Sequence, residues 1–129
     1  MTDSPGADAQ LSPNPVLLDP VAGGARRLID LARRHARGYR AAEPFPHLVL
    51  DDLFDAAVLR QIAVEFPDLA DGPSIRYQNP LEMKLASCGE ARFGPATRHL
   101  MHYLNSEPFL QFLQRLTGID EVLLPDPYF

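Results

Sequence analysis

The spacing of apolar residues along the chain predicts four helices. They are expected at residues 20–41, 52–66, 95–105 and 106–117. Within each range apolar side chains recur three or four residues apart, which places them on one face of a helix. Asp19 and Ser106 suit N-cap positions, and Pro20 and Pro108 fit the first turn. Gly118 suits the position just after a helix C-terminus, so the last helix has signals at both ends.

Shorter apolar runs have the spacing of strands. Strands are expected at residues 46–51 and 121–124 and, within a loop rich in proline and glycine over 67–95, near 75–78. In the first strand Leu48 and Leu50 would face one side, with His47 and Val49 on the other. Because this run is short and apolar, we expect both of its faces to be buried.

These elements predict an α+β fold in which helices dominate. The strands 46–51 and 121–124 should share one sheet, with the helices 52–66 and 106–117 packed against it. Asp51 or Asp52 would cap the helix over 52–66. The expected core consists of Leu48, Leu50, Phe54, Val58, Ile62, Leu100, Leu104, Phe109, Leu113 and Leu116.

Length and composition limit the class of protein without specifying its chemistry. With 129 residues, 46% of them hydrophobic and 22% charged, the chain suits one globular domain. A single cysteine, Cys88, excludes a disulfide within the chain. Apolar runs are too short to cross a bilayer, and the acidic N-terminus lacks the basic start of a secretory signal. We therefore expect a cytoplasmic protein with no membrane partner.

Composition, helical spacing and charge together divide the chain into three parts. Residues 1–15 are expected to be a disordered tail, 16–43 to hold an amphipathic helix with six arginines, and 44–129 to form the main domain. The net charge of −5 disfavours nucleic acid as the main partner. The arginines would form either a solvated outer face or a surface for an acidic protein, a nucleic acid or an anionic membrane.

Few residues suggest catalysis or metal binding. None of the four histidines is followed two positions later by an acidic residue, so the chain lacks the His-x-Asp pattern of mononuclear iron oxygenases. His99 and His102 lie three apart on a predicted helix and, with Cys88, form a weak zinc candidate. Cys88 could also act as a nucleophile with either histidine, although an inert cysteine is the simpler interpretation.

One polar cluster lies in the long loop. It consists of Tyr77, Asn79, Glu82 and Lys84, and Lys84 is the only lysine in the chain. A lysine beside tyrosine and asparagine has the chemistry to hold a carboxylate. Surface exposure alone would also explain all four residues. No glycine-rich phosphate loop occurs.

Several segments, in order, resemble the 2-oxoglutarate- and iron(II)-dependent oxygenases, in particular the bacterial prolyl-4-hydroxylase-like group. The matching segments are Pro-Phe-Pro-His-Leu-Val-Leu-Asp-Asp-Leu-Phe at 44–54, Glu-Phe-Pro at 65–67, Tyr-x-Asn-x-x-Glu-x-Lys at 77–84, a Leu-Asn-Ser to Thr-Gly-Ile stretch at 104–119 and Leu-Leu-Pro-Asp-Pro-Tyr at 123–128. The resemblance covers residues 43–129. Each motif alone is common, whereas five in the family's order are more specific.

The resemblance implies the helical support layer and first strands of a double-stranded β-helix, or jelly-roll, oxygenase domain. In the family the His-x-Asp motif, the second iron histidine and the 2-oxoglutarate anchor come later than the segments matched here. The chain is therefore expected to be an N-terminal portion that ends before the metal site and is inactive alone. Its partner would be the C-terminal half of the domain.

No catalytic, iron or cofactor residue of the family can be assigned to this chain. The full-length protein would use iron(II) and 2-oxoglutarate to hydroxylate an undetermined substrate, either a protein side chain or a small molecule. Tyr77, Asn79 and Lys84 are the candidates for a loop on the substrate side. The alternative is a non-catalytic interaction module that binds through the arginine-rich helix or an exposed apolar face.

Overall fold

The computed structural model describes residues 19–70, 75–79, 81–86 and 89–127. The expected disordered tail over 1–15 lies outside these ranges, as does Cys88. The elements are α1 (Gly24–Ala41), α2 (Ala56–Glu65), β1 (Ile75–Asn79), β2 (Glu82–Ala86), the 3-10 turn η2 (Glu90–Arg92), α3 (Pro95–Leu104) and α4 (Glu107–Thr117). The chain is thus α+β with helices dominant, as predicted. The described residues contain one two-stranded sheet and no jelly roll.

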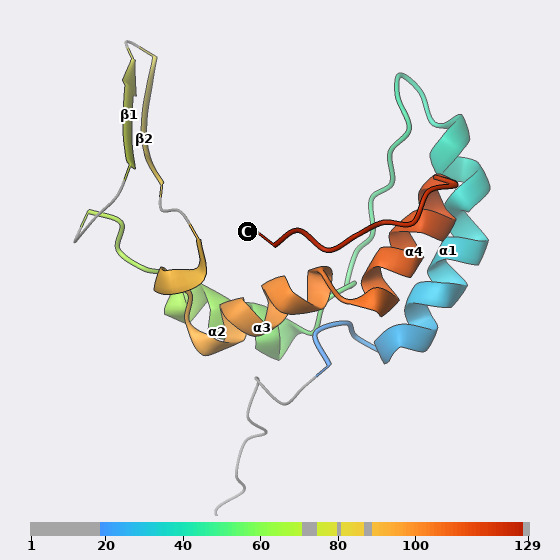
Figure 1. Cartoon of the computed structure of the whole chain (residues 1–129), viewed down its shortest axis with the longest axis horizontal. Coiled ribbons are helices and arrows are strands. Elements are labelled where there is room, and N and C mark those ends of the chain that lie inside the picture. The colour runs from blue at the N-terminus through green and yellow to red at the C-terminus, as the bar shows by residue number, and fades with distance from the viewer. Residues whose placement is uncertain (1–18, 71–74, 80, 87–88, 128–129) are drawn as a thin grey trace, which may run out of the picture.

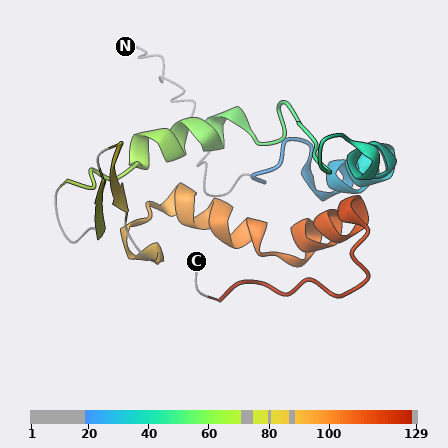
Figure 2. The same ribbon diagram turned by 90° about the horizontal axis from the view of Figure 1, so that it is seen from above.

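The four helices form two pairs (Figures 1 and 2). α1 packs along α4, and α2 packs along α3. Figure 1 shows α1 and α4 rising together at one end, while the β1–β2 hairpin rises at the other. The continuous path from α3 through Asn105 and Ser106 into α4 runs between the two ends.

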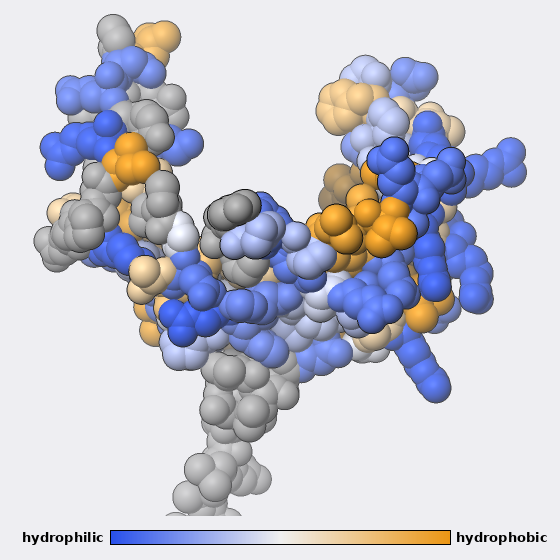
Figure 3. All heavy atoms as spheres, viewed as in Figure 1, coloured by the Kyte–Doolittle hydropathy of each residue, from blue (hydrophilic) through white to orange (hydrophobic). Residues whose placement is uncertain are grey.

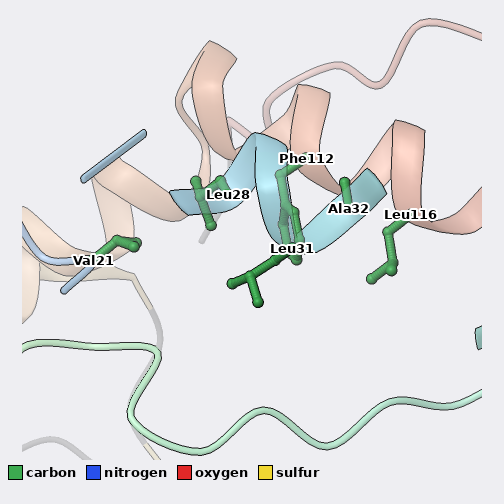
Figure 4. Close-up of a cluster of buried hydrophobic side chains, with 6 residues drawn as sticks. All are labelled: Val21, Leu28, Leu31, Ala32, Phe112 and Leu116. Carbon is green, nitrogen blue, oxygen red and sulfur yellow. The ribbon is translucent and has the colours of Figure 1, made fainter. Parts of the chain in front are cut away.

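Apolar contacts between α1 and α4 form the main core. Leu28, Leu31 and Ala32 on α1 meet Phe112 and Leu116 on α4, as Figure 4 shows, and all five are buried. Val21, which precedes α1, is only 1% exposed and completes the cluster. Val58 of α2 and Ala96 of α3 are buried at the other pair.

A short backbone pairing joins the two helix pairs. Val21 and Phe54 form an antiparallel bridge. On either side of it the amide of Ala22 donates to the carbonyl of Leu53 at 2.9 Å, and the amide of Asp55 donates to that of Pro20 at 2.8 Å. Arg27 reinforces this junction by donating from Nη1 to the carbonyl of Asp52 at 2.6 Å.

This pairing corrects two predicted helix starts. α1 begins at Gly24 rather than at residue 20, because Gly23 and Gly24 adopt φ of +83° and +70° and separate the paired segment from the helix. The Asp19 carboxylate accepts from the amide of Val21 and so stabilises a turn before the helix. α2 begins at Ala56, and its N-cap is Asp55, which accepts from Ala57 and Val58, rather than Asp51 or Asp52.

The ends of α3 and α4 confirm the sequence signals. α3 has proline in its first turn and ends at Leu104. α4 starts after Ser106, although no side-chain hydrogen bond caps it, and it ends at Gly118 with φ of +76°. A positive φ is unfavourable for residues with a Cβ, which is why glycine marks this end.

The predicted strands 46–51 and 121–124 are wrong, because neither segment is a strand or pairs with another strand among the residues that the structure describes. They do not share a sheet, and α2 and α4 pack on α3 and α1 instead. The alternation in the first segment is partly confirmed. Leu48 and Leu50 pack against the core, whereas Val49 is 78% exposed and His47 is exposed, so only one face is covered.

The predicted core was partly right. Val58 and Leu116 are buried, and the other eight predicted residues, Leu48, Leu50, Phe54, Ile62, Leu100, Leu104, Phe109 and Leu113, are half-buried. Val21 and Leu31 are buried without having been predicted. None of the helices in the described ranges combines the length and apolar character needed to span a bilayer.

Leu28→Ala should lower the free energy of unfolding by about 2–5 kcal/mol, because it leaves a cavity between α1 and α4. Urea titration followed by circular dichroism measures this change. Leu124→Ala is the matched control, since Leu124 is 79% exposed and its loss should cost no more than about 0.5 kcal/mol. Equal losses in the two variants would show that the α1–α4 contact is not the core of the fold.

Candidate functional site

The polar cluster at residues 77–84 folds as an antiparallel hairpin. β1 and β2 pair so that Tyr77 is opposite Lys84 and Asn79 is opposite Glu82. Directly opposed residues of an antiparallel pair share a face, and so do residues two apart on one strand. The register therefore brings these four positions, three of which were predicted as site residues, onto one face of the hairpin.

Asn79 also shapes the turn between the strands. Its Oδ1 accepts a hydrogen bond from the amide of Leu81 at 2.9 Å. This geometry is typical of asparagine in tight turns. Leu81 at the tip is 98% exposed, and both Asn79 and Lys84 are exposed. The predicted loop over 67–95 thus contains a second strand, β2, which single-strand spacing did not reveal.

Glu65 fixes the base of the segment that carries the hairpin. It is the last residue of α2, and its carboxylate receives hydrogen bonds from the first turn of α3. The amide of Ala96 donates at 3.0 Å to Oε2 and the amide of Thr97 at 3.1 Å. A helix N-terminus has unpaired amides and a partial positive charge, so it favours a carboxylate there. We refer to this contact as the Glu65 clamp.

The pKa of Glu65 reflects this environment. Burial raises it, but the hydrogen bonds from Thr97, Ala96 and Gln61 outweigh burial and hold the pKa below its ordinary value of 4.5. The clamp therefore favours the charged carboxylate in the folded state. A second tie lies nearby, where Arg92 Nη2 donates to the carbonyl of Asp68 at 2.7 Å.

The histidines do not assemble a metal site with the residues described. His102 Nε2 lies 2.8 Å from Glu90 Oε2, and Arg98 Nε lies 3.7 Å from the same oxygen. This cluster on α3 and η2 is exposed. Within the described ranges no three histidine, cysteine or carboxylate side chains come together as metal ligands. The zinc and nucleophile candidates that include Cys88 fall on a residue outside those ranges.

Apolar surface lies on the side of the α1–α4 pair that faces the hairpin (Figure 3). The surface of the molecule is hollowed between this helix pair and the hairpin. Two extended segments contribute exposed apolar residues, the first before α2 around residues 45–50 and the last after α4 around residues 121–124. In the first, Phe45 and Val49 are 64% and 78% exposed, and in the last, Val122 and Leu124 are 76% and 79% exposed. The sequence analysis placed Val49, Val122 and Leu124 in strands and so missed that they are exposed, whereas Phe45 lies just before the first predicted strand.

Comparison of the chain with protein-family models, with curated proteins and with solved structures found no match. Function is therefore inferred from the residues and their arrangement.

Glu65→Gln should lower the free energy of unfolding by about 1–2 kcal/mol at neutral pH, because the charge at the α3 N-terminus is lost. Since the folded pKa lies below the unfolded one, the clamp stabilises fully above about pH 4.5 and is lost as pH falls through the folded value. Urea titrations between pH 7 and pH 3 should show a shallower acid dependence in the variant. Glu121→Gln, at an exposed residue, should retain the wild-type dependence.

Gly94→Ala should disrupt the same clamp, because a Cβ at this position would overlap the Glu65 carboxylate. Combined with Glu65→Gln, it should destabilise less than the two single changes added together. Gly38→Ala, where a Cβ meets nothing within 4 Å, should be neutral or stabilising. Strict additivity in the double-mutant cycle would contradict the assignment of Gly94 to the clamp.

Proposed function

We propose that this chain is the N-terminal supporting layer of a 2-oxoglutarate- and iron(II)-dependent oxygenase related to the bacterial prolyl-4-hydroxylase-like group. The hairpin face would border the substrate site. The observation that carries the proposal is the strand register, in which the motif positions Tyr77, Asn79, Glu82 and Lys84 form two directly opposed pairs on one face. A motif whose members converge on one face is more informative than the same letters in sequence.

The two extended segments are consistent with a layer that supports further strands. Leu48 and Leu50 anchor the first segment to the helices and leave Val49 outward. Val122 and Leu124 extend the exposed apolar surface, and neither segment pairs with a strand in the described ranges. Unpaired extended backbone with apolar side chains is the kind of surface that additional strands cover. In the proposal these strands belong to the jelly roll.

The described residues do not themselves fit an iron site. No metal ligand set occurs among them, and no histidine of the sequence stands two positions before an acid. The proposal therefore places iron and 2-oxoglutarate on ligands from the C-terminal half of the domain. The residues of this chain would position the substrate, and no chemical step is assigned to them.

The direct test is made on the product of the native gene, purified from its source. We expect an intact mass above 14.3 kDa and iron(II)-dependent conversion of 2-oxoglutarate to succinate. The control is the 129-residue chain alone, which should neither bind iron(II) stoichiometrically nor consume 2-oxoglutarate. A native product of 14.3 kDa without this activity would overturn the proposal.

Lys84→Ala in the active native product should lower turnover of 2-oxoglutarate about tenfold or more, because a charged hydrogen bond contributes about 1.5–3 kcal/mol. The matched control is Gln78→Ala, an exposed residue of the same hairpin whose position lies on the opposite face. It should change turnover less than about twofold. Equal effects of the two variants would show that the hairpin face is not near the substrate.

The second candidate function is a non-catalytic interaction module. The observation that favours it is the outer face of α1, where arginines are exposed and have no acidic partner among the described residues. This function does not exclude the first, because α1 and the hairpin lie at opposite ends of the molecule (Figure 1).

A further inference from the structure

A stripe of arginines follows the outer side of α1. Arg26, Arg33, Arg37 and Arg40 fall within one narrow sector of the helix, because they are spaced by seven, four and three residues. All four are exposed, and over this span the helix rises about 21 Å. The opposite side of α1 is buried against α4. The stripe is therefore held on a fixed, packed helix.

These arginines have no acidic partner within the part of the chain that the structure describes. Among the described residues, ion pairs join Arg98 and His102 to Glu90, on a different part of the molecule. No side chain of the stripe makes a hydrogen bond or ion pair with the residues described. Asp30 lies on the same helix, but it is one acid among six arginines between residues 24 and 41. The stripe thus remains strongly positive in a chain of net charge −5.

An apolar groove runs beside the stripe, between α1 and α4. It has a volume of about 270 Å³, and Ala25, Ile29 and Pro108 contribute apolar surface to it. Ile29 is 41% exposed, although it lies next to the buried side of α1. Phe112, only 4% exposed, forms part of the floor. The groove therefore offers room for an apolar side chain.

Positive charge stands on both sides of this groove. Arg115 of α4 lines it, and Arg26 and Arg33 lie one helical turn to either side of Ile29 on α1. The acid at the groove is Glu107, whose Oε1 accepts from Gln111 at 2.8 Å. A ligand with an apolar anchor flanked by carboxylates would match this arrangement in shape and in charge.

We propose that the α1–α4 groove binds an acidic amphipathic segment of a partner protein. An apolar side chain of that segment would contact Ile29 and Pro108, and its carboxylates would pair with Arg26, Arg33 and Arg115. A nucleic acid is less well matched, because the groove exposes no aromatic ring on which a base could stack. This inference does not depend on the oxygenase proposal, and its test measures binding without iron or 2-oxoglutarate.

The test uses the full chain and a synthetic helical peptide of about 15 residues, a length at which isolated helices begin to form. Its sequence alternates leucine and glutamate at helical spacing. Calorimetry or fluorescence anisotropy measures its dissociation constant. Three comparison probes are the same peptide with lysine for glutamate, a glutamate peptide without leucine, and a single-stranded oligonucleotide of equal charge.

We expect the Leu/Glu peptide to bind. Its affinity should fall as salt is raised from about 50 to about 300 mM, because salt screens the attraction between exposed charges. Arg33→Glu combined with Arg115→Glu should weaken binding about tenfold or more, and Ile29→Gln about threefold or more. Arg60→Glu is the matched control, because Arg60 is exposed on α2 and far from the groove in sequence and structure. It should leave binding unchanged.

All the replaced side chains are at least partly exposed, so we expect every variant to fold. Thermal melts of each variant check this. Absence of binding by the Leu/Glu peptide at millimolar concentration would overturn the proposal. It would also be overturned if the leucine-free peptide or the oligonucleotide bound as tightly and with the same dependence on Arg33 and Arg115. Those results would assign the stripe to general anion binding instead.

Discussion

The pairing of Pro20–Ala22 with Leu53–Asp55 is the contact on which the arrangement of the helices depends. α1 packs on α4 and α2 packs on α3, and α3 also contacts α4 where the two helices join. The backbone bridge at Val21 and Phe54 closes the opposite side of this frame. Two hydrogen bonds and a buried valine thereby give the two helix pairs a second connection, besides the junction of α3 with α4.

Each candidate site is carried by a different part of this frame. The hairpin belongs to the excursion between α2 and α3, which the Glu65 clamp closes at its base. The arginine stripe belongs to α1, whose orientation depends on the core with α4. Because the two sites are at opposite ends, changes at one need not alter the other, and a single chain has room for both a substrate face and a docking face (Figure 1).

An element could be predicted from the sequence when nearby residues determine it, and not when residues distant in sequence do. α3 and α4 were found because their signals, proline in the first turn and Gly118 at the end, are local. Alternation at Leu48 and Leu50 correctly indicated extended backbone with one covered face. It could not show that none of the described strands pairs with this segment, because strand pairing depends on distant residues. The start of α1 was misplaced for the same reason, since Val21 is held by Phe54. For the candidate site, the residues Tyr77, Asn79 and Lys84 were found by motif, whereas their convergence required the register with β2.

The clamp also bears on how this architecture tolerates change in length. Glu65 and Ala96 are 31 positions apart in sequence yet in direct contact, so the ends of the intervening segment are fixed whatever lies between them. For a segment closed in this way, doubling its length costs only about 0.6 kcal/mol of closure entropy. Insertions or deletions within the hairpin should therefore leave the helical frame intact, and this excursion is a place where a foreign loop could be grafted.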